Sequence, residues 1–261
     1  MAGEVRQHRP PSQIEVLGKG LRLPLPAIDR EHIEVILEII QYAFSDISQD
    51  YPDVLRAGQE RDINHLMVGR LCTMLRPSDL RTFSDDAPLL VLWRQLADTV
   101  ARGSEAVSHD AEHLELRPDL NVYLTRGHPN FPLKIECKLI DAANRKPAKL
   151  YCDCGIVRFL AGDYGWGTRE GIMLAYVRDG SSISSALAPL LGTVTGPNMY
   201  DLEQALAPIG PKPPDLAHSR HWRRFKYPGR PLAESEPGPI ALWHLWLSVP
   251  ALLSSSAAES T

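Results

Sequence analysis

The sequence predicts an α/β protein, in which a mixed central β-sheet is flanked by helices and carries an N-terminal helical layer. Three observations support this fold class. Apolar residues recur at helical spacing through much of residues 28–103. Two β-type runs, 116–124 and 132–140, then stand at hairpin spacing. A helical stretch within 150–167 and an apolar run over 171–177 follow, in the order of a crossover helix and a parallel strand.

The chain of 261 residues is long enough for one large domain with an appendage. Residues 1–27 are rich in proline and polar residues, so we expect a flexible arm there. Residues 28–103 are expected to form the helical part that packs on the core. The core itself is expected over 104–250, and the small polar residues of 251–261 predict a disordered tail.

Three helices are predicted in the N-terminal part. The first begins after Asp29, which is a favourable N-cap residue, and carries an apolar stripe. The second covers about 59–75. The third follows Ser84, has Pro88 near its first turn and ends at Gly103.

The C-terminal part alternates between helical and β-type patterns. The stretch 150–167 predicts a helix followed by a glycine-rich turn, and 171–177 predicts a strand. Two short helices are expected over 182–191 and 198–207. A last apolar strand is expected over 239–249, where His244 is interpreted as a hydrogen-bonded core residue.

Three ionisable residues mark the predicted hairpin. Asp119 opens its first run, and Glu136 and Lys138 lie two apart on the second, so that their side chains share one face. If the runs pair, Asp119 comes close to that face. Two neighbouring carboxylates repel unless a cation lies between them, and a hard divalent ion such as Mg²⁺ prefers oxygen ligands. A lysine beside such an ion can orient a water molecule or neutralise charge on a phosphate oxygen.

At these residues the chain resembles the PD-(D/E)xK restriction-endonuclease-like nuclease superfamily. The motif reads Pro118-Asp119 and Glu136-Cys137-Lys138, with sixteen residues between the two acids. The resemblance implies a restriction-endonuclease-like core and hydrolysis of DNA phosphodiester bonds with Mg²⁺, for which Mn²⁺ could substitute. It also implies that Asp119, Glu136 and the backbone carbonyl of Cys137 bind the metal, and that Lys138 positions or activates the attacking water.

The third carboxylate has three candidates. Glu60 falls on the apolar stripe of the second predicted helix, where a carboxylate is costly unless it is paired or bound to metal. The resemblance favours it, since many nucleases of this superfamily place a glutamate on the first core helix. Glu60 could equally be an exposed first-turn residue favoured by the helix dipole. Glu112 and Glu115, which precede the Asp119 run, are the rivals, unless they belong to a solvated acidic linker.

Two groups of cations are candidates for binding nucleic acid. Arg158, on the predicted crossover helix, could meet a phosphate or could pair with Asp153 or Asp163. The second group interleaves cations with aromatic residues, a composition typical of contact with phosphates and bases; its cations are Arg220, Arg223, Arg224 and Lys226. The alternative is a basic strand whose aromatic residues Trp222 or Phe225 face the core.

The charge distribution favours an acidic partner for the middle of the chain. The net charge is −4 overall, which by itself argues against nucleic acid. Residues 117–230, however, contain 16 Lys and Arg against 10 Asp and Glu, a net charge of +6, whereas residues 1–116 carry −7. The segment with the motif is therefore the basic one, as expected for a part that binds phosphates.

Composition also suggests a compartment and partners. There is no apolar run of eighteen residues and no apolar leader, so we expect neither a membrane span nor a secretory signal. Four cysteines in a chain of this size indicate free thiols and a cytoplasmic protein. A further resemblance, to bacterial nuclease-like proteins of phage defence or restriction, implies DNA as partner. An inactive scaffold that recruits a helicase or ATPase is the alternative, and a homodimer is compatible with either.

Overall fold

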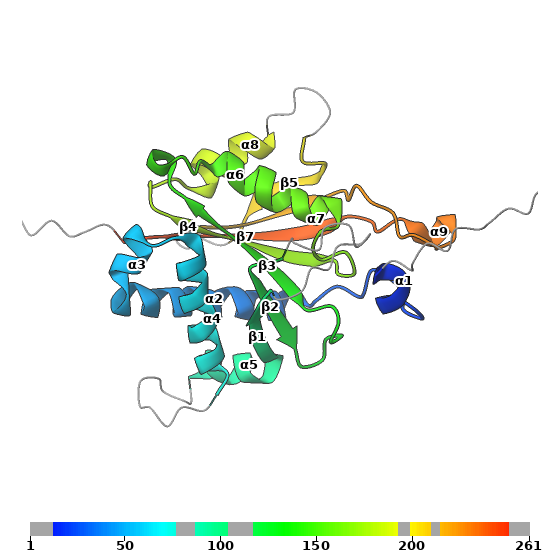
Figure 1. Cartoon of the computed structure of the whole chain (residues 1–261), viewed down its shortest axis with the longest axis horizontal. Helices are drawn as coiled ribbons and strands as arrows, with labels where there is room; N and C mark the ends of the chain where they lie inside the picture. Colours follow the sequence, from blue (N-terminus) through cyan, green and yellow to red (C-terminus); the bar gives the residue numbers. More distant parts are fainter. Residues whose placement is uncertain (1–12, 77–86, 104–116, 193–198, 210–214, 251–261) are drawn as a thin grey trace, which may run out of the picture.

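The structure is a computed structural model that describes residues 13–76, 87–103, 117–192, 199–209 and 215–250. Its centre is a seven-stranded mixed sheet with the strand order β1-β2-β3-β4-β7-β6-β5 (Figure 1). The strands are β1 (Ala97–Arg102), β2 (Leu120–Leu124), β3 (Leu133–Ile140), β4 (Glu170–Val177), β5 (Leu202–Pro208), β6 (Asp215–His221) and β7 (Ile240–Ser248). Strands β3, β4 and β7 run parallel, and the outer strands pair antiparallel with their neighbours. The prediction of an α/β protein with a mixed sheet is confirmed.

Helices cover both faces of the sheet (Figure 1). The face below the sheet in that view carries α2 (Arg30–Asp50), α3 (Pro52–Ala57), α4 (Glu60–Met74) and α5 (Pro88–Leu96). The opposite face carries α6 (Ala148–Tyr151), the π-helical turn η2 (Cys152–Ile156), α7 (Val157–Ala161), the π-helical turn η3 (Ile183–Leu187) and α8 (Ala188–Gly192). The remaining short elements are α1 (Gln13–Leu17), the 3₁₀ turn η1 (Ala142–Asn144) and α9 (Leu232–Ser235).

Two hydrophobic cores lie on the two faces, and β4 contributes to both. Ile172, Leu174 and Tyr176 pack with the helices of the α2 side, whereas Met173 and Ala175 pack with those of the α7 side. All eight residues of β4 are buried, as expected for a strand covered on both faces. The face that a residue occupies therefore follows from strand alternation, and it decides which helices a polar side chain can meet.

The last part of the third predicted helix is a strand. Helix α5 ends at Leu96, and residues 97–102 form β1, which pairs antiparallel with β2. An apolar residue every three or four positions is compatible with both structures, and the free edge of β2 selects the strand. Because β1 belongs to the central sheet, the predicted boundary at residue 103 separates one strand from its sheet. The second short helix expected over 198–207 is wrong for the same reason, since residues 202–208 form β5 beside β6.

The N-terminal arm is packed where the structure describes it, rather than flexible. Leu23 is buried in a cluster with Phe131 and Trp166, and the backbone N–H of Leu25 donates to the carbonyl of Gly167 over 2.8 Å. Arg230 donates to two carbonyls of the same arm. The large apolar residues of this segment thus pack on an aromatic surface. The proline content alone had predicted a flexible arm over 1–27.

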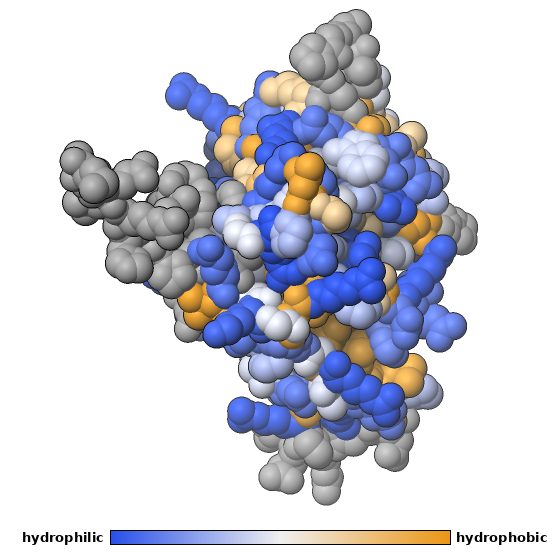
Figure 2. Space-filling model, turned by 90° about the vertical axis from the view of Figure 1, so that its right-hand side faces the viewer, coloured by the Kyte–Doolittle hydropathy of each residue, from blue (hydrophilic) through white to orange (hydrophobic). Residues whose placement is uncertain are grey.

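The outer surface is mixed in character. In the view of Figure 2, hydrophobic side chains emerge in separate small groups among hydrophilic ones. Within the described residues, no helix has both the length and the apolar character that crossing a membrane requires.

Candidate active site

The candidate site lies where strands β2 and β3 separate. The hydrogen-bonded pairing of β2 with β3 ends at Ile135. The next two backbone N–H groups on the β2 side of β3, those of Cys137 and Leu139, therefore have no strand partner. The N–H of Cys137 instead donates to Oδ2 of Asp119 over 2.8 Å, and that of Leu139 donates to Oε2 of Glu60 over 2.7 Å. Buried N–H groups must be paired, and here two carboxylates take the place of a strand. The structure thus brings Asp119 and Glu60 to one edge of β3.

Glu136 and Lys138 meet at the same edge. Oε1 of Glu136 accepts hydrogen bonds from Nζ of Lys138 over 2.6 Å and from Nη1 of Arg158 over 3.1 Å. The Lys138 ammonium also lies 2.8 Å from the carbonyl oxygen of Cys137 and 3.8 Å from Oε1 of Glu60. One cation therefore contacts oxygen atoms of three different groups, all of which were predicted as metal ligands, Glu60 as the favoured third carboxylate.

One oxygen of Glu136 is left without a partner. The residue is fully buried, and no group among the described residues bonds its Oε2. A buried carboxylate oxygen is costly to leave unpaired, and such groups are few in folded proteins. The unpaired atom belongs to the residue that the motif places at the centre of the site, so a functional explanation is the first to consider.

Burial and mutual repulsion set the ionisation of this cluster. Burial raises the pKa of Glu136 to about 8, with a further contribution from Asp119, against the lowering effect of Lys138 and Arg158. Burial also raises the pKa of Asp119. For Lys138, burial acts to lower the pKa, but the carboxylates of Glu136, Glu60 and Asp119 outweigh it, and the pKa is raised. Lys138 therefore stays protonated at neutral pH.

A buried relay that was not predicted orients Asp119. The side chain of Asn64 on α4 is fully buried, and its Nδ2 donates to Oδ1 of Asp119 over 2.8 Å. The hydroxyl of Tyr176, also fully buried, donates to Oδ1 of Asn64 over 2.9 Å. Asn64 follows Glu60 by one helical turn, so both point at the sheet. A polar residue among the apolar positions of the helix, four after a candidate ligand, was the signal in the sequence.

Arg158 faces the site instead of pairing with Asp153 or Asp163. Its Nη1 donates to the hydroxyl of Tyr164 over 2.7 Å as well as to Glu136, and Tyr164 donates in turn to the carbonyl of Arg117 over 2.6 Å. The crossover helix α7 thus holds a guanidinium, whose side chain is 29% exposed, directly beside the buried acid.

The cations of 220–226 are engaged locally. Arg223 is buried, and its guanidinium donates to the backbone carbonyls of Gly165, Trp166, Thr168, Pro237 and Gly238. The other three each form an ion pair with a neighbouring acid; the pairs are Arg220 with Glu203, Arg224 with Asp201, and Lys226 with Glu236. Phe225 is buried, whereas Trp222 is 51% exposed. Arg223 thus crosslinks two loops, which removes it from the candidate DNA contacts.

The described residues contain no group of three or more His, Cys, Asp or Glu side chains arranged to hold a metal ion. At this site Nζ of Lys138 lies among the oxygens, and both oxygens of Asp119 accept hydrogen bonds. Glu112 and Glu115, the rival candidates for the third carboxylate, lie outside the described residues. Glu60 is therefore the only one of the three that the described part of the chain can place, and it lies at the site.

Comparison of the chain with protein-family models, with curated proteins and with solved structures found no match. The resemblance to the PD-(D/E)xK nucleases therefore rests on the motif residues themselves.

Proposed function

We propose that the chain is a Mg²⁺-dependent endonuclease that hydrolyses DNA phosphodiester bonds, with Mn²⁺ as a substitute ion. The observation that carries this proposal is the unpaired, buried Oε2 of Glu136 beside Asp119, Glu60 and Lys138. The proposal includes a restriction-endonuclease-like core, because an antiparallel hairpin, a crossover helix and a parallel strand follow one another in β2, β3, α7 and β4.

The donor set fits a hard divalent ion. Glu136 offers an oxygen that no group of the described residues uses, and the Cys137 carbonyl and Glu60 offer two more. Asp119 keeps lone pairs, since each carboxylate oxygen can accept about two hydrogen bonds or metal contacts. These four residues would hold Mg²⁺, which when bound lowers the pKa of a water ligand and neutralises charge on a phosphate oxygen.

The chain's own cations would handle the substrate. Lys138, which stays protonated, would hold the attacking water or a phosphate oxygen by donating hydrogen bonds, rather than remove a proton itself. Arg158 would exchange its contact with Glu136 for a bidentate contact with a phosphate, because its side chain is partly exposed beside the site. Tyr164 and Asn64 would position Arg158 and Asp119 respectively.

The wider DNA contact would use the exposed cations of the C-terminal part. Arg220, Arg224 and Lys226 have side chains that are 41%, 42% and 63% exposed. An exposed ion pair contributes little to stability, so each of these cations can be transferred to a phosphate at small cost. We propose phage defence or restriction in bacteria as the setting, with a homodimer as the form that cuts both strands.

A second function follows from one observation: the Lys138 ammonium already contacts the oxygens that would bind a metal. In this alternative the chain binds DNA without cleaving it and recruits a helicase or ATPase subunit as part of a defence complex. The unpaired Oε2 of Glu136 favours the nuclease, because a fixed internal ion pair gains nothing from an oxygen left without a partner.

A plasmid-nicking assay separates the two functions. The parent, Asp119→Ala, Lys138→Ala and the control Arg30→Gln are each incubated with supercoiled DNA and Mg²⁺. Arg30 is an exposed cation on helix α2, and its ion-pair partner in the described part of the chain is Glu34. The nuclease predicts nicking by the parent and by Arg30→Gln, and none by the other two. Equal nicking by all four would assign the activity to a contaminant, and salt-sensitive DNA binding without nicking would support the scaffold.

A further inference from the structure

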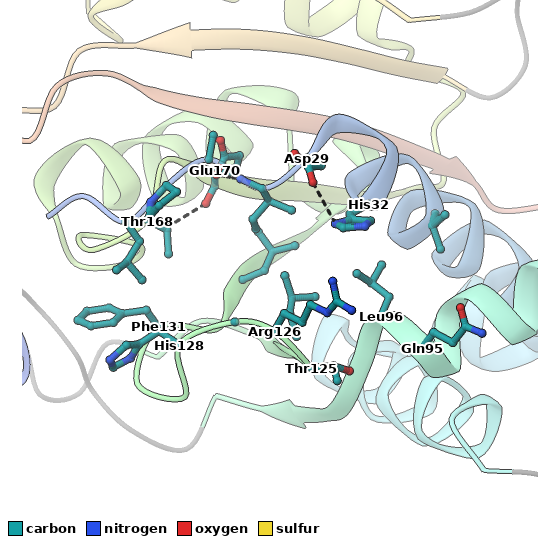
Figure 3. Close-up of a pocket in the computed structure, with 18 of the residues that line it drawn as sticks. Asp29, His32, Gln95, Leu96, Thr125, Arg126, His128, Phe131, Thr168 and Glu170 are labelled. Atoms are coloured by element: carbon teal, nitrogen blue, oxygen red, sulfur yellow. Dashed lines mark hydrogen bonds and ion pairs between the residues drawn. The ribbon is translucent and has the colours of Figure 1, made fainter. Parts of the chain in front are cut away.

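A cavity of about 620 Å³ lies away from the candidate active site (Figure 3). It is enclosed by the arm that leads into α2, by α5 and by the loop that joins β2 to β3. Leu133 of its wall packs with the core on the α2 side of the sheet, whereas Glu136 and Lys138 belong to the alternate set of β3 side chains. The volume falls within the range of about 300–1,000 Å³ that small-molecule sites occupy.

The walls of the cavity are largely apolar. Leu92, Leu96, Leu124, Leu133 and Phe131 all line it. Leu92 is 49% exposed, although the other face of its helix is part of the core. Apolar side chains gathered around an open cavity of this size leave surface that a ligand with an apolar body would remove from water.

An unpaired cation lies at the mouth of the cavity. Figure 3 shows the guanidinium of Arg126 directed from the β2–β3 loop toward the α2 side, where His32 lies. No acid among the described residues pairs with Arg126. His32 has only a distant carboxylate neighbour, Oδ2 of Asp29 at 3.9 Å. A free guanidinium at the edge of an apolar cavity favours an acidic group on whatever enters.

A hydrogen-bond acceptor lies at the inner wall. Glu170, at the start of β4, is 7% exposed and lines the cavity. Its Oε2 accepts from the backbone N–H of Ile28 over 3.2 Å, and no group of the described residues donates to its Oε1. Burial raises the pKa of Glu170 to about 7, so at neutral pH the protonated form is present beside the ionised one, and repulsion of an anionic ligand is reduced. An N–H or O–H of a ligand would find its acceptor here.

We propose that this cavity is a binding site for a small amphipathic acid. The ligand class has an apolar, ring-sized body in the cavity, an acidic group on Arg126 and a hydrogen-bond donor toward Glu170. The site is separate from the proposed metal site and does not depend on nuclease activity. Its position against the turn of the β2–β3 hairpin places the ligand on the two strands that lead to the other site, since Asp119 directly precedes β2 and Glu136 lies in the middle of β3.

Two matched fluorescent probes test the proposal. 8-Anilinonaphthalene-1-sulfonate has an aromatic body, an N–H donor and a sulfonate, whereas N-phenyl-1-naphthylamine has the same body and donor without the acid. We expect the parent to bind the sulfonate probe at one site and more tightly than the neutral probe. The difference between the probes isolates the contact with the cation.

Substitutions locate the site. Arg126→Gln changes an exposed loop residue. It is expected to lower the affinity for the sulfonate probe about tenfold, as for the loss of one charge-assisted contact, and to leave the affinity for the neutral probe unchanged. Leu96→Trp fills the cavity and is expected to weaken the binding of both probes. Leu92→Trp, at the rim, replaces it if the first variant does not fold. Lys149→Gln, at an exposed cation on the opposite face, is the control that changes neither.

The outcomes are decisive for the cavity alone. Sulfonate binding at the parent level in Arg126→Gln, or in both cavity-filling variants, would overturn the proposal, as would a parent that binds neither probe. Thermal melting of each variant shows that it is folded. Because no step uses DNA or Mg²⁺, failure here leaves the proposed nuclease untouched, and absence of nicking leaves this site standing.

Discussion

One buried polar cluster lies on the α7 side of the sheet and another at the edge of β3 between α4 and α7, and they differ in whether their hydrogen bonds are complete. The first is a chain of side chains, Tyr151, His244, Ser219 and His221, that ends on the carbonyl of Tyr200. The second is the carboxylate site at the edge of β3, where Oε2 of Glu136 has no partner in the described part of the molecule. Both clusters are covered by helices, but only in the first does every polar side-chain atom of the cluster have a hydrogen-bond partner.

The direction of the histidine chain can be read from its end. The Tyr200 carbonyl only accepts, so Nδ1 of His221 carries the proton. Burial lowers the pKa of His221 to about 4, so its Nε2 is an acceptor at neutral pH and takes the proton of Ser219. Ser219 then accepts from Nε2 of His244, so Nδ1 of His244 is the acceptor toward the hydroxyl of Tyr151, whose other acceptor is the carbonyl of Met173 at 3.0 Å. Each ring nitrogen of the chain has one partner, and each of its two hydroxyls has two.

The contrast separates a structural cluster from a functional one. A closed network stabilises and specifies the core, and it has no capacity to bind anything else. An open carboxylate costs stability and keeps a ligand position free. The four predictions that follow, ordered from the largest expected effect, would break or sharpen this distinction.

The largest effect is expected for Glu136→Gln in the plasmid-nicking assay. The substitution keeps the shape and removes the charge, so nicking should fall by about 10²- to 10³-fold, as when one preorganised electrostatic group is lost. Thermal melting should show a variant at least as stable as the parent, since a neutral amide is cheaper to bury. Parent-level nicking by this variant would contradict a role for Glu136 in the reaction.

His244→Leu should act on stability and not on nicking. The change removes one of the two partners of Ser219 and one of the two partners of Tyr151, at about 0.5–1.5 kcal/mol for each hydrogen bond lost. Urea denaturation measures the loss of unfolding free energy, and His65→Leu, at an exposed histidine, is the control with about 0.5 kcal/mol or less. A folded His244→Leu variant that has lost nicking would erase the distinction between the clusters.

Asn64→Leu tests the relay behind Asp119. It removes the hydrogen bond to Oδ1 of Asp119 and puts an apolar side chain of similar length in its place, so nicking should fall by about 10- to 100-fold, as for other residues that orient a ligand. The rate should recover in part at higher Mg²⁺, because the defect is in placing a ligand. A rate loss that Mg²⁺ does not change would assign Asn64 to packing alone.

The last prediction, set apart from that order because it compares slopes rather than a single loss, is the pH dependence of stability. The pKa of Glu136 is raised from its ordinary value of 4.5 to about 8 in the folded protein. Between these two pH values the folded protein holds a proton that the unfolded chain has released. The contribution to stability is full below the lower value and is lost as the pH rises through the upper one. Urea titrations at several pH values should therefore show the free energy of unfolding falling more steeply for the parent than for Glu136→Gln. Parallel curves would mean that Glu136 is ionised in the folded protein at all these pH values.

The sequence predicts the central elements well because their signals are local. The hairpin, the crossover helix and the parallel strand are read from apolar runs and turns, and His244 stands out as a polar residue inside an apolar strand. Strands β1 and β5 are missed because pairing with a neighbour, which no local pattern records, decides their structure.

The contacts of the candidate site also fall into those that local spacing predicts and those that only the fold creates. Spacing on one strand predicts that Glu136 and Lys138 meet, and the hairpin places Asp119 near them. The arginines of 220–226 could be recognised as cations, but the burial of Arg223 against five carbonyls depends on a loop far along the chain. Asn64 and Tyr176 meet across a gap of 112 residues, a contact that only the fold creates.

The most direct test of the central claim is Mg²⁺ binding itself, measured by calorimetry near pH 8 in the absence of DNA. The parent is expected to bind the ion, with affinity that falls at least about tenfold in both Glu136→Gln and Asp119→Asn, as for loss of a ligand or its support. Undiminished Mg²⁺ binding by these two variants, or none by the parent, would show that the open oxygen of Glu136 does not belong to a metal site.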